Sequence, residues 1–108
     1  MAYDEGLAQL MRDALADAPF TEKRMFGGLC FLLHGNMVCG VHKGGAMFRV
    51  GKPNDATARA IDGVGPMMFT GKPMQGFVEC VDEVVSDDAR RAALIGLSLA
   101  FSKSLPPK

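Results

Sequence analysis

The stretch KRMFGGLCFLLHGNMVCGV, residues 23–41, decides the fold of this 108-residue chain. Two adjacent glycines follow a basic dipeptide, and only His-Gly-Asn interrupts the apolar run after them. Short apolar runs separated by Gly-containing turns are typical of consecutive antiparallel strands. The pair Gly35-Asn36, with glycine first, has the chemistry of a two-residue type II′ loop. The stretch therefore predicts a β-hairpin.

This loop would place Leu32 opposite Cys39. One face of the hairpin would then carry Cys30, Leu32, His34, Met37, Cys39 and Val41, and the other Leu29, Phe31, Leu33, Val38, Gly40 and His42. Both faces are largely apolar, whereas an antiparallel sheet with one solvated face alternates apolar and polar residues. We expect helices to cover one face, and a partner protein or a second copy of the chain, as a homodimer, to cover the other. The alternative is that helices cover both sides of a strongly bent sheet.

The rest of the chain supplies helices at both ends. Apolar spacings of three and four predict a helix over residues 3–16, and Ser86 is expected to cap a helix that runs to about residue 104. Between them we expect strands near 22–26, 29–34, 37–42 and 46–50, a short helix from Pro53, and two strands around a Gly71-Lys72-Pro73 turn. The order α, β-meander, α, β, β, α predicts one two-layer α+β domain with an antiparallel sheet over residues 1–108.

Positive charge is concentrated in the middle of a chain whose net charge is zero. Residues 18–75 hold seven Lys or Arg against three acids. The candidate binding residues are Lys23, Arg24, Arg49, Lys52 and Lys72. They do not form the dense basic stripe that binding to a phosphate backbone requires. We expect them to border a protein-binding surface; binding of nucleic acid or a small anion is the alternative.

Neither export nor a metal site is predicted. No apolar run approaches the about 18 residues of a membrane span, and the first twenty residues lack a signal-peptide pattern, so we expect a cytoplasmic protein that binds no membrane. The three cysteines fit free thiols in a reducing compartment. No CxxC or CxxH spacing is present, although Cys30 and Cys39 are expected to be diagonal neighbours in the hairpin.

Catalysis has little support from the sequence. Gly27 and Gly28 open a strand rather than a helix, and neither GxGxxG nor GxxxxGK[ST] occurs, so no cofactor is predicted. A methyltransferase would need a Gly-rich strand-to-helix turn in a parallel sheet, which an antiparallel meander does not provide. We expect no enzyme activity. The two glycines are expected to permit a bend or the close approach of another backbone.

The stretches KRMFGGLCFLLHGNMVCGV, MFRVG, FTGKPMQGFV and LSLAFSKSLPPK resemble the N-terminal domain of the TfoX/Sxy family. The positions that carry the resemblance include Met25, Phe26, Gly27, Gly28, Gly35, Asn36, Gly71 and Pro73. The resemblance covers nearly the whole chain and implies a compact α+β unit. Longer members regulate competence genes and carry a further C-terminal domain, so we expect a standalone domain here. The resemblance implies a link to transcription regulation, and the apolar sheet face leads us to expect a non-catalytic protein-interaction module.

Overall fold

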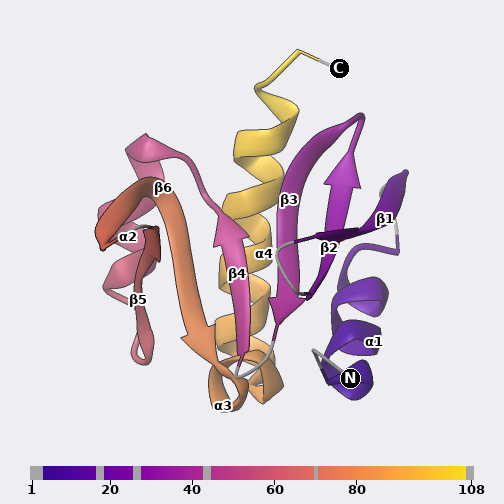
Figure 1. Ribbon diagram of the computed structural model, residues 1–108, viewed down its shortest axis with the longest axis horizontal. Coiled ribbons are helices and arrows are strands. Elements are labelled where there is room, and N and C mark those ends of the chain that lie inside the picture. Colours follow the sequence, from indigo (N-terminus) through magenta and orange to yellow (C-terminus); the bar gives the residue numbers. More distant parts are fainter. Residues whose placement is uncertain (1–3, 17–18, 26–27, 43–44, 70, 107–108) are drawn as a thin grey trace.

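The computed structural model describes residues 4–16, 19–25, 28–42, 45–69 and 71–106. These residues form an antiparallel sheet with helices packed against one face (Figure 1). The elements are α1 (Glu5–Ala14), β1 (Phe20–Met25), β2 (Gly28–Leu33), β3 (Asn36–His42), β4 (Gly45–Arg49), η1 (Lys52–Asn54), α2 (Asp55–Arg59), β5 (Val64–Phe69), β6 (Lys72–Val81), α3 (Asp82–Ser86) and α4 (Asp88–Lys103). The strand order is β1-β2-β3-β4-β6-β5. The α+β prediction is confirmed.

The N-terminal helix forms as its sequence predicts. The Asp4 carboxylate accepts hydrogen bonds from the backbone N–H groups of Gly6, at 2.7 Å, and Leu7, at 3.2 Å, which satisfies amides that have no partner within the helix. Leu7, Met11 and Leu15 recur at four-residue spacing and are buried. The helix therefore presents one apolar stripe to the sheet.

The C-terminal helix begins later than expected. Ser86 ends the short helix α3, and Asp87 is the N-cap of α4, where its carboxylate accepts from the Arg90 backbone N–H at 2.8 Å. The prediction of Ser86 as the cap is wrong because α3 uses the residues before Asp87 to bury Val84 and Val85. Figure 1 shows α4 crossing behind β3 and β4.

One apolar core lies between the helices and the sheet. Every α-helix contributes buried side chains to it, including Met11 from α1, Ala58 from α2, Val85 from α3 and Leu94 from α4. The sheet contributes alternate residues of the central strands: Leu29, Phe31, Cys39, Val41, Ala46, Phe48, Val78 and Cys80. The helices whose core residues are described thus share one face of the sheet, as expected.

The β2–β3 hairpin turns one residue earlier than predicted. Its loop is His34-Gly35, with φ of 51° and 84°, and Leu33 pairs with Asn36. Positive φ at both loop residues belongs to a type I′ turn, so the type II′ prediction is wrong. Asn36 lies in the strand, 4% exposed, where its side-chain N–H donates to the Pro106 carbonyl oxygen at 2.9 Å. This contact with the C-terminus is invisible to local turn rules.

The shifted loop moves many side chains of β3 to the face of the sheet opposite the predicted one. A one-residue change of register moves side chains to the opposite face of a sheet. Cys39 now pairs with Phe31 and lies in the core, while Gly40 pairs with Cys30 on the other face. The register then changes by one residue between Phe31 and Leu32, so that Met37 lies opposite Leu32 near the loop.

Two glycine predictions have different outcomes. Gly28 opens β2, and a Cβ there would overlap the Val41 carbonyl oxygen, so the expected close approach of backbones is confirmed. Gly71 has a φ of 80°, but Lys72 and Pro73 already belong to β6, so the predicted turn is shorter than expected. Phe26, Gly27, Lys43 and Gly44, which also carry predictions, lie outside the described residues.

Candidate binding surface

The face of the sheet opposite the core is called the open face here. Residues paired across neighbouring strands point to the same side, so the register fixes its members. They include Lys23 of β1, Cys30 and Leu32 of β2, Met37, Gly40 and His42 of β3, Met47 and Arg49 of β4, and Phe77, Glu79 and Val81 of β6. None of these residues belongs to the apolar core. Val81 is 55% exposed.

The centre of the open face is filled around Gly40. A Cβ at Gly40 would lie 3.2 Å from Cys30 Sγ and 3.3 Å from Met47 Cε, so these two side chains occupy the space above the glycine. Cys30 is 1% exposed and Met47 is 3% exposed. The apolar surface of this face is therefore presented by residues around the centre, such as Leu32, Phe77 and Val81.

The cysteines are held as neutral thiols. Burial raises the pKa of Cys30 and of Cys39, and burial raises the pKa of Cys80 to about 12. A thiol that stays protonated at neutral pH is a weak nucleophile. Cys30 and Cys39 lie on opposite faces of the sheet, so their expected approach as diagonal neighbours is wrong; the shifted register is the reason.

The five basic residues do not form one continuous border. Lys23 and Arg24 lie on the edge strand β1, pointing to opposite faces, and Lys72 lies at the start of β6. Arg49 and Lys52 line the same hollow, so the structure brings these two together. The predicted border is divided because β1 and β6 are separated by three strands in the sheet.

We call the space beside Arg49 the Arg49 hollow. It has a volume of about 290 Å³ and is lined by Arg49, Gly51, Lys52, Pro53, Gln75, Gly76, Phe77 and Phe101. The Arg49 guanidinium carbon lies 5.7 Å from the centre of the Phe77 ring and 5.4 Å from that of Phe101. Both distances are within the range of cation–π attraction. The two rings, one from β6 and one from α4, hold the guanidinium in place.

Two glycines make room for this arrangement. Gly51 and Gly76 both have a φ of 86°, in the left-handed region that favours glycine. A Cβ at Gly51 would overlap the Phe101 ring. The backbone N–H groups of Val50 and Gly51 both donate to the Gly76 carbonyl oxygen, at 2.9 and 3.0 Å, which joins the end of β4 to β6.

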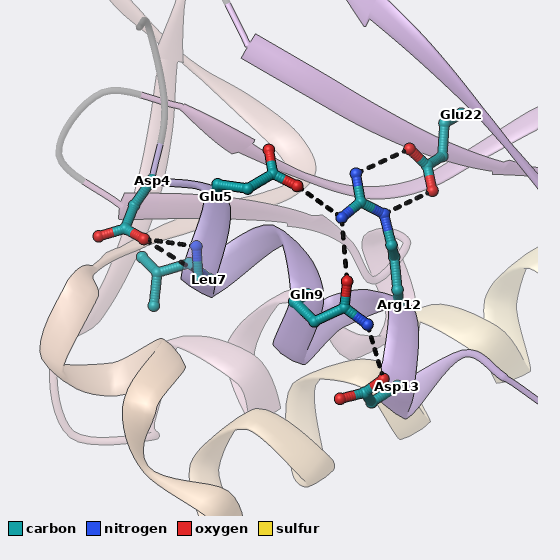
Figure 2. Close-up of polar contacts among 8 residues, drawn as sticks. Asp4, Glu5, Leu7, Gln9, Arg12, Asp13 and Glu22 are labelled. Carbon is teal, nitrogen blue, oxygen red and sulfur yellow. Dashed lines mark hydrogen bonds and ion pairs between the residues drawn. The ribbon is translucent and has the colours of Figure 1, made fainter.

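A second polar cluster joins α1 to β1 (Figure 2). Arg12 donates from Nε and Nη2 to the two carboxylate oxygens of Glu22, at 2.7 and 3.1 Å. Its Nη1 donates to Glu5 at 2.7 Å and to Gln9 at 3.2 Å. These bonds, Glu22 first, raise the pKa of Arg12. We call this group the Arg12 cluster; it fastens an edge strand to a helix.

A histidine and a carboxylate meet at the other end of the open face. His42 Nε2 lies 3.9 Å from Glu79 Oε2, and both residues line a hollow of about 410 Å³ with Gly65 and Val81. Over the described part of the chain, no group of three His, Cys, Asp or Glu side chains is placed to hold a metal ion. In the same residues, no helix has the length and apolar character needed to cross a membrane.

The sequence identified Arg49 and Lys52 but missed their aromatic neighbours. Phe77 and Phe101 lie in separate elements, and no motif links them to Arg49. The one local signal was the glycine on each side of the contact, Gly51 and Gly76, which marks a close approach. Their partners become visible only in the folded chain.

Comparison with known families agrees with this architecture. The model of the TfoX N-terminal domain matches residues 5–102. The chain belongs to the TfoX N-terminal domain family. The matched range runs from the start of α1 to the last turn of α4, so this TfoX N-terminal domain includes the open face and the Arg49 hollow. Searches of curated proteins and of solved structures found no match.

Proposed function

We propose that this TfoX N-terminal domain is a non-catalytic protein-interaction module in transcription-linked regulation, and that it binds its partner through the open face. The observation that carries the proposal is the apolar side chains of this face. Val81 is 55% exposed, and Leu32, Met37 and Phe77 are only partly buried. Apolar groups that gather on one face of a small domain mark interaction sites.

The charges on the open face indicate the chemistry of the partner. Within the described residues, Lys23 and Arg49 have no carboxylate within ion-pair distance, whereas Glu79 lies near His42. An apolar protein surface with carboxylates at its margin would complement this face. A symmetric contact between two copies would instead bring together two faces that each carry Lys23 and Arg49 and the carboxylate of Glu79. We therefore favour a different protein over a second copy.

Two observations favour protein binding as the function, the first over catalysis and the second over nucleic-acid binding. The buried cysteine thiols have raised pKa values, which makes them poor nucleophiles. The basic residues are divided among β1, the Arg49 hollow and the start of β6, whereas a nucleic-acid backbone is bound by clustered cations. The family supports the regulatory part of the proposal.

Capture from an extract of the source cell, after nuclease treatment, tests the surface. Val81→Glu adds a charge to the open face at an exposed position, and Ala92→Glu adds the same charge at an exposed position on α4. We expect a protein retained by the wild type and by Ala92→Glu to be lost with Val81→Glu. Equal retention by both variants would contradict the use of this face. Capture that disappears with nuclease would favour nucleic acid.

Two further measurements separate the remaining alternatives. Sedimentation velocity at micromolar concentration reports a second copy, which would appear as a dimer that Val81→Glu dissociates. For the regulatory role, transcripts are compared in cells that lack the gene and cells that regain it. We expect the wild type and Ala92→Glu, but not Val81→Glu, to restore the transcript levels. Unchanged transcripts on loss of the gene would argue against a link to transcription.

A further inference from the structure

Arg49 differs from the arginines that lie in the helices because it has no carboxylate partner in the described part of the chain. Arg12, Arg59, Arg90 and Arg91 each lie within 4.0 Å of a carboxylate oxygen. Arg49 makes neither an ion pair nor a hydrogen bond to any residue in the described part of the chain. Arg49 as a residue is partly buried, and none of its side-chain nitrogens is fully buried, so its five N–H donors are accessible to a ligand from outside the chain.

The Arg49 side chain is nevertheless held in position. The Phe77 ring of β6 and the Phe101 ring of α4 lie 5.7 and 5.4 Å from the guanidinium carbon, and the lack of a Cβ at Gly51 leaves room for the Phe101 ring. Contacts of this kind reduce the rotamer freedom that a ligand would otherwise have to remove. The hollow therefore presents donors that are ordered before any ligand binds.

The backbone around the hollow favours a carboxylate over a phosphate. Phosphate sites commonly use several free backbone N–H groups. Here the N–H groups of Val50 and Gly51 are already bonded to Gly76, that of Asn54 donates to the Gly51 carbonyl oxygen, and Pro53 has none. The guanidinium fork can donate to two oxygens of a carboxylate or of a phosphate, so it is the use of these backbone N–H groups within the chain that favours the carboxylate.

We propose that the Arg49 hollow is a subsite for a carboxylate attached to an apolar or aromatic carbon frame. The Arg49 guanidinium donates hydrogen bonds to the two carboxylate oxygens, and the Lys52 ammonium adds positive charge. The rings of Phe77 and Phe101 contact the carbon frame. Among the residues that the structure describes, no acidic side chain lines the hollow to repel the anion. The carboxylate belongs either to a free small acid or to the C-terminus of a peptide.

Only the peptide source rests on the proposed function, because a partner protein would then supply the carboxylate. The Arg49 hollow lies at one end of the open face, so a partner seated on Phe77 could place its C-terminus there. Binding of a free acid is independent of any partner. An experiment can therefore disprove the carboxylate subsite without disproving the protein-interaction function, and the reverse also holds.

Titration of the ¹⁵N-labelled protein, followed by amide and Arg Nε–H signals, tests the subsite. The probes are sodium phenylacetate, acetyl-Ala-Phe with a free carboxylate, the same dipeptide as its C-terminal amide, and sodium phosphate. We expect saturable shifts at Arg49, Gly51 and Gly76 with a carboxylate probe, and none with the amide. Tighter binding of the dipeptide than of phenylacetate indicates a peptide source; the reverse order indicates a free acid.

Matched variants locate the binding. Arg49→Met keeps an apolar stem and removes the N–H donors, and we expect it to weaken carboxylate binding roughly tenfold or more. Arg24→Met makes the same replacement on the far edge strand and is expected to leave binding unchanged. Equal binding of acid and amide, phosphate bound as tightly as the carboxylates, or full binding by Arg49→Met would each overturn the proposal. The acid–amide comparison needs only the wild-type chain, so the test stands even if Arg49→Met does not fold.

Discussion

Arg12 and Arg49 both join a helix to the sheet, but their partners are different. Arg12 is bonded to Glu22, Glu5 and Gln9, so its donors are used within the chain (Figure 2). Arg49 is held by two aromatic rings, which attract its charge without accepting a strong hydrogen bond. The first arrangement is complete as a structural contact. The second leaves a fixed guanidinium whose donors are available to a ligand.

The largest expected effect comes from closing the Arg49 hollow. Gly51→Ala would force an alanine into φ near 86° and its Cβ into the Phe101 ring. We expect a loss of about 2–4 kcal/mol in the free energy of unfolding, measured by urea denaturation. Gly96→Ala is the control, because in the described part of the chain a Cβ at that helical position meets no atom within 4 Å apart from its neighbours and the backbone of its own helix; it should stabilise by roughly 0.5–1 kcal/mol. Equal stability of the wild type and Gly51→Ala would refute the crowding argument.

A smaller effect is expected at the start of the helix that carries Arg12. Asp4→Ala removes the acceptor for two backbone N–H groups of α1. The free energy of unfolding should fall by about 1 kcal/mol, and Asp4→Ser, which keeps a capping oxygen, should lose less. Because α1 is remote from the Arg49 hollow, carboxylate binding by the folded protein should not change. A loss of that binding would mean that the two regions are coupled.

The Arg12 cluster itself should contribute less than its number of contacts suggests. A double-mutant cycle of Arg12→Met and Glu22→Gln isolates the pair, whose side chains are 25% and 31% exposed. Since solvent screens partly exposed pairs, we expect a coupling energy of about 0.5–1 kcal/mol that decreases in high salt. A coupling that is independent of salt would indicate packing rather than charge.

The smallest effect concerns the helix that carries Phe101. The hydrogen bond from the Arg90 backbone N–H lowers the pKa of Asp87 below its ordinary value of 3.8. A carboxyl group whose pKa is lower in the folded state contributes stability above its ordinary pKa and loses it as the pH falls through the folded value. Asp87→Asn keeps a capping oxygen and removes the charge. Its melting temperature should be slightly below that of the wild type at pH 7, and the two should converge as the pH falls below 3.8 and through the lowered pKa of Asp87.

Much of the fold was predictable because local patterns determine it. The spacing of Leu7, Met11 and Leu15 placed α1 to within two residues at each end. The meander was also predicted, yet the loop between β2 and β3 lies one residue earlier than expected. Local turn chemistry favoured Gly35-Asn36, whereas in the folded chain Asn36 lies in the strand and its side chain donates to the Pro106 carbonyl oxygen.

By itself, the sequence determined the class of fold and the basic residues available for binding. It also determined the helices at the two ends of the chain and the strands between them. These follow from periodicity and from neighbours along the chain. Only the tertiary structure decided which side chains of β3 face the core and that Arg49 meets Phe77 and Phe101. Such contacts join residues far apart in the chain, so their geometry depends on how the helices and strands pack together and not on any local pattern.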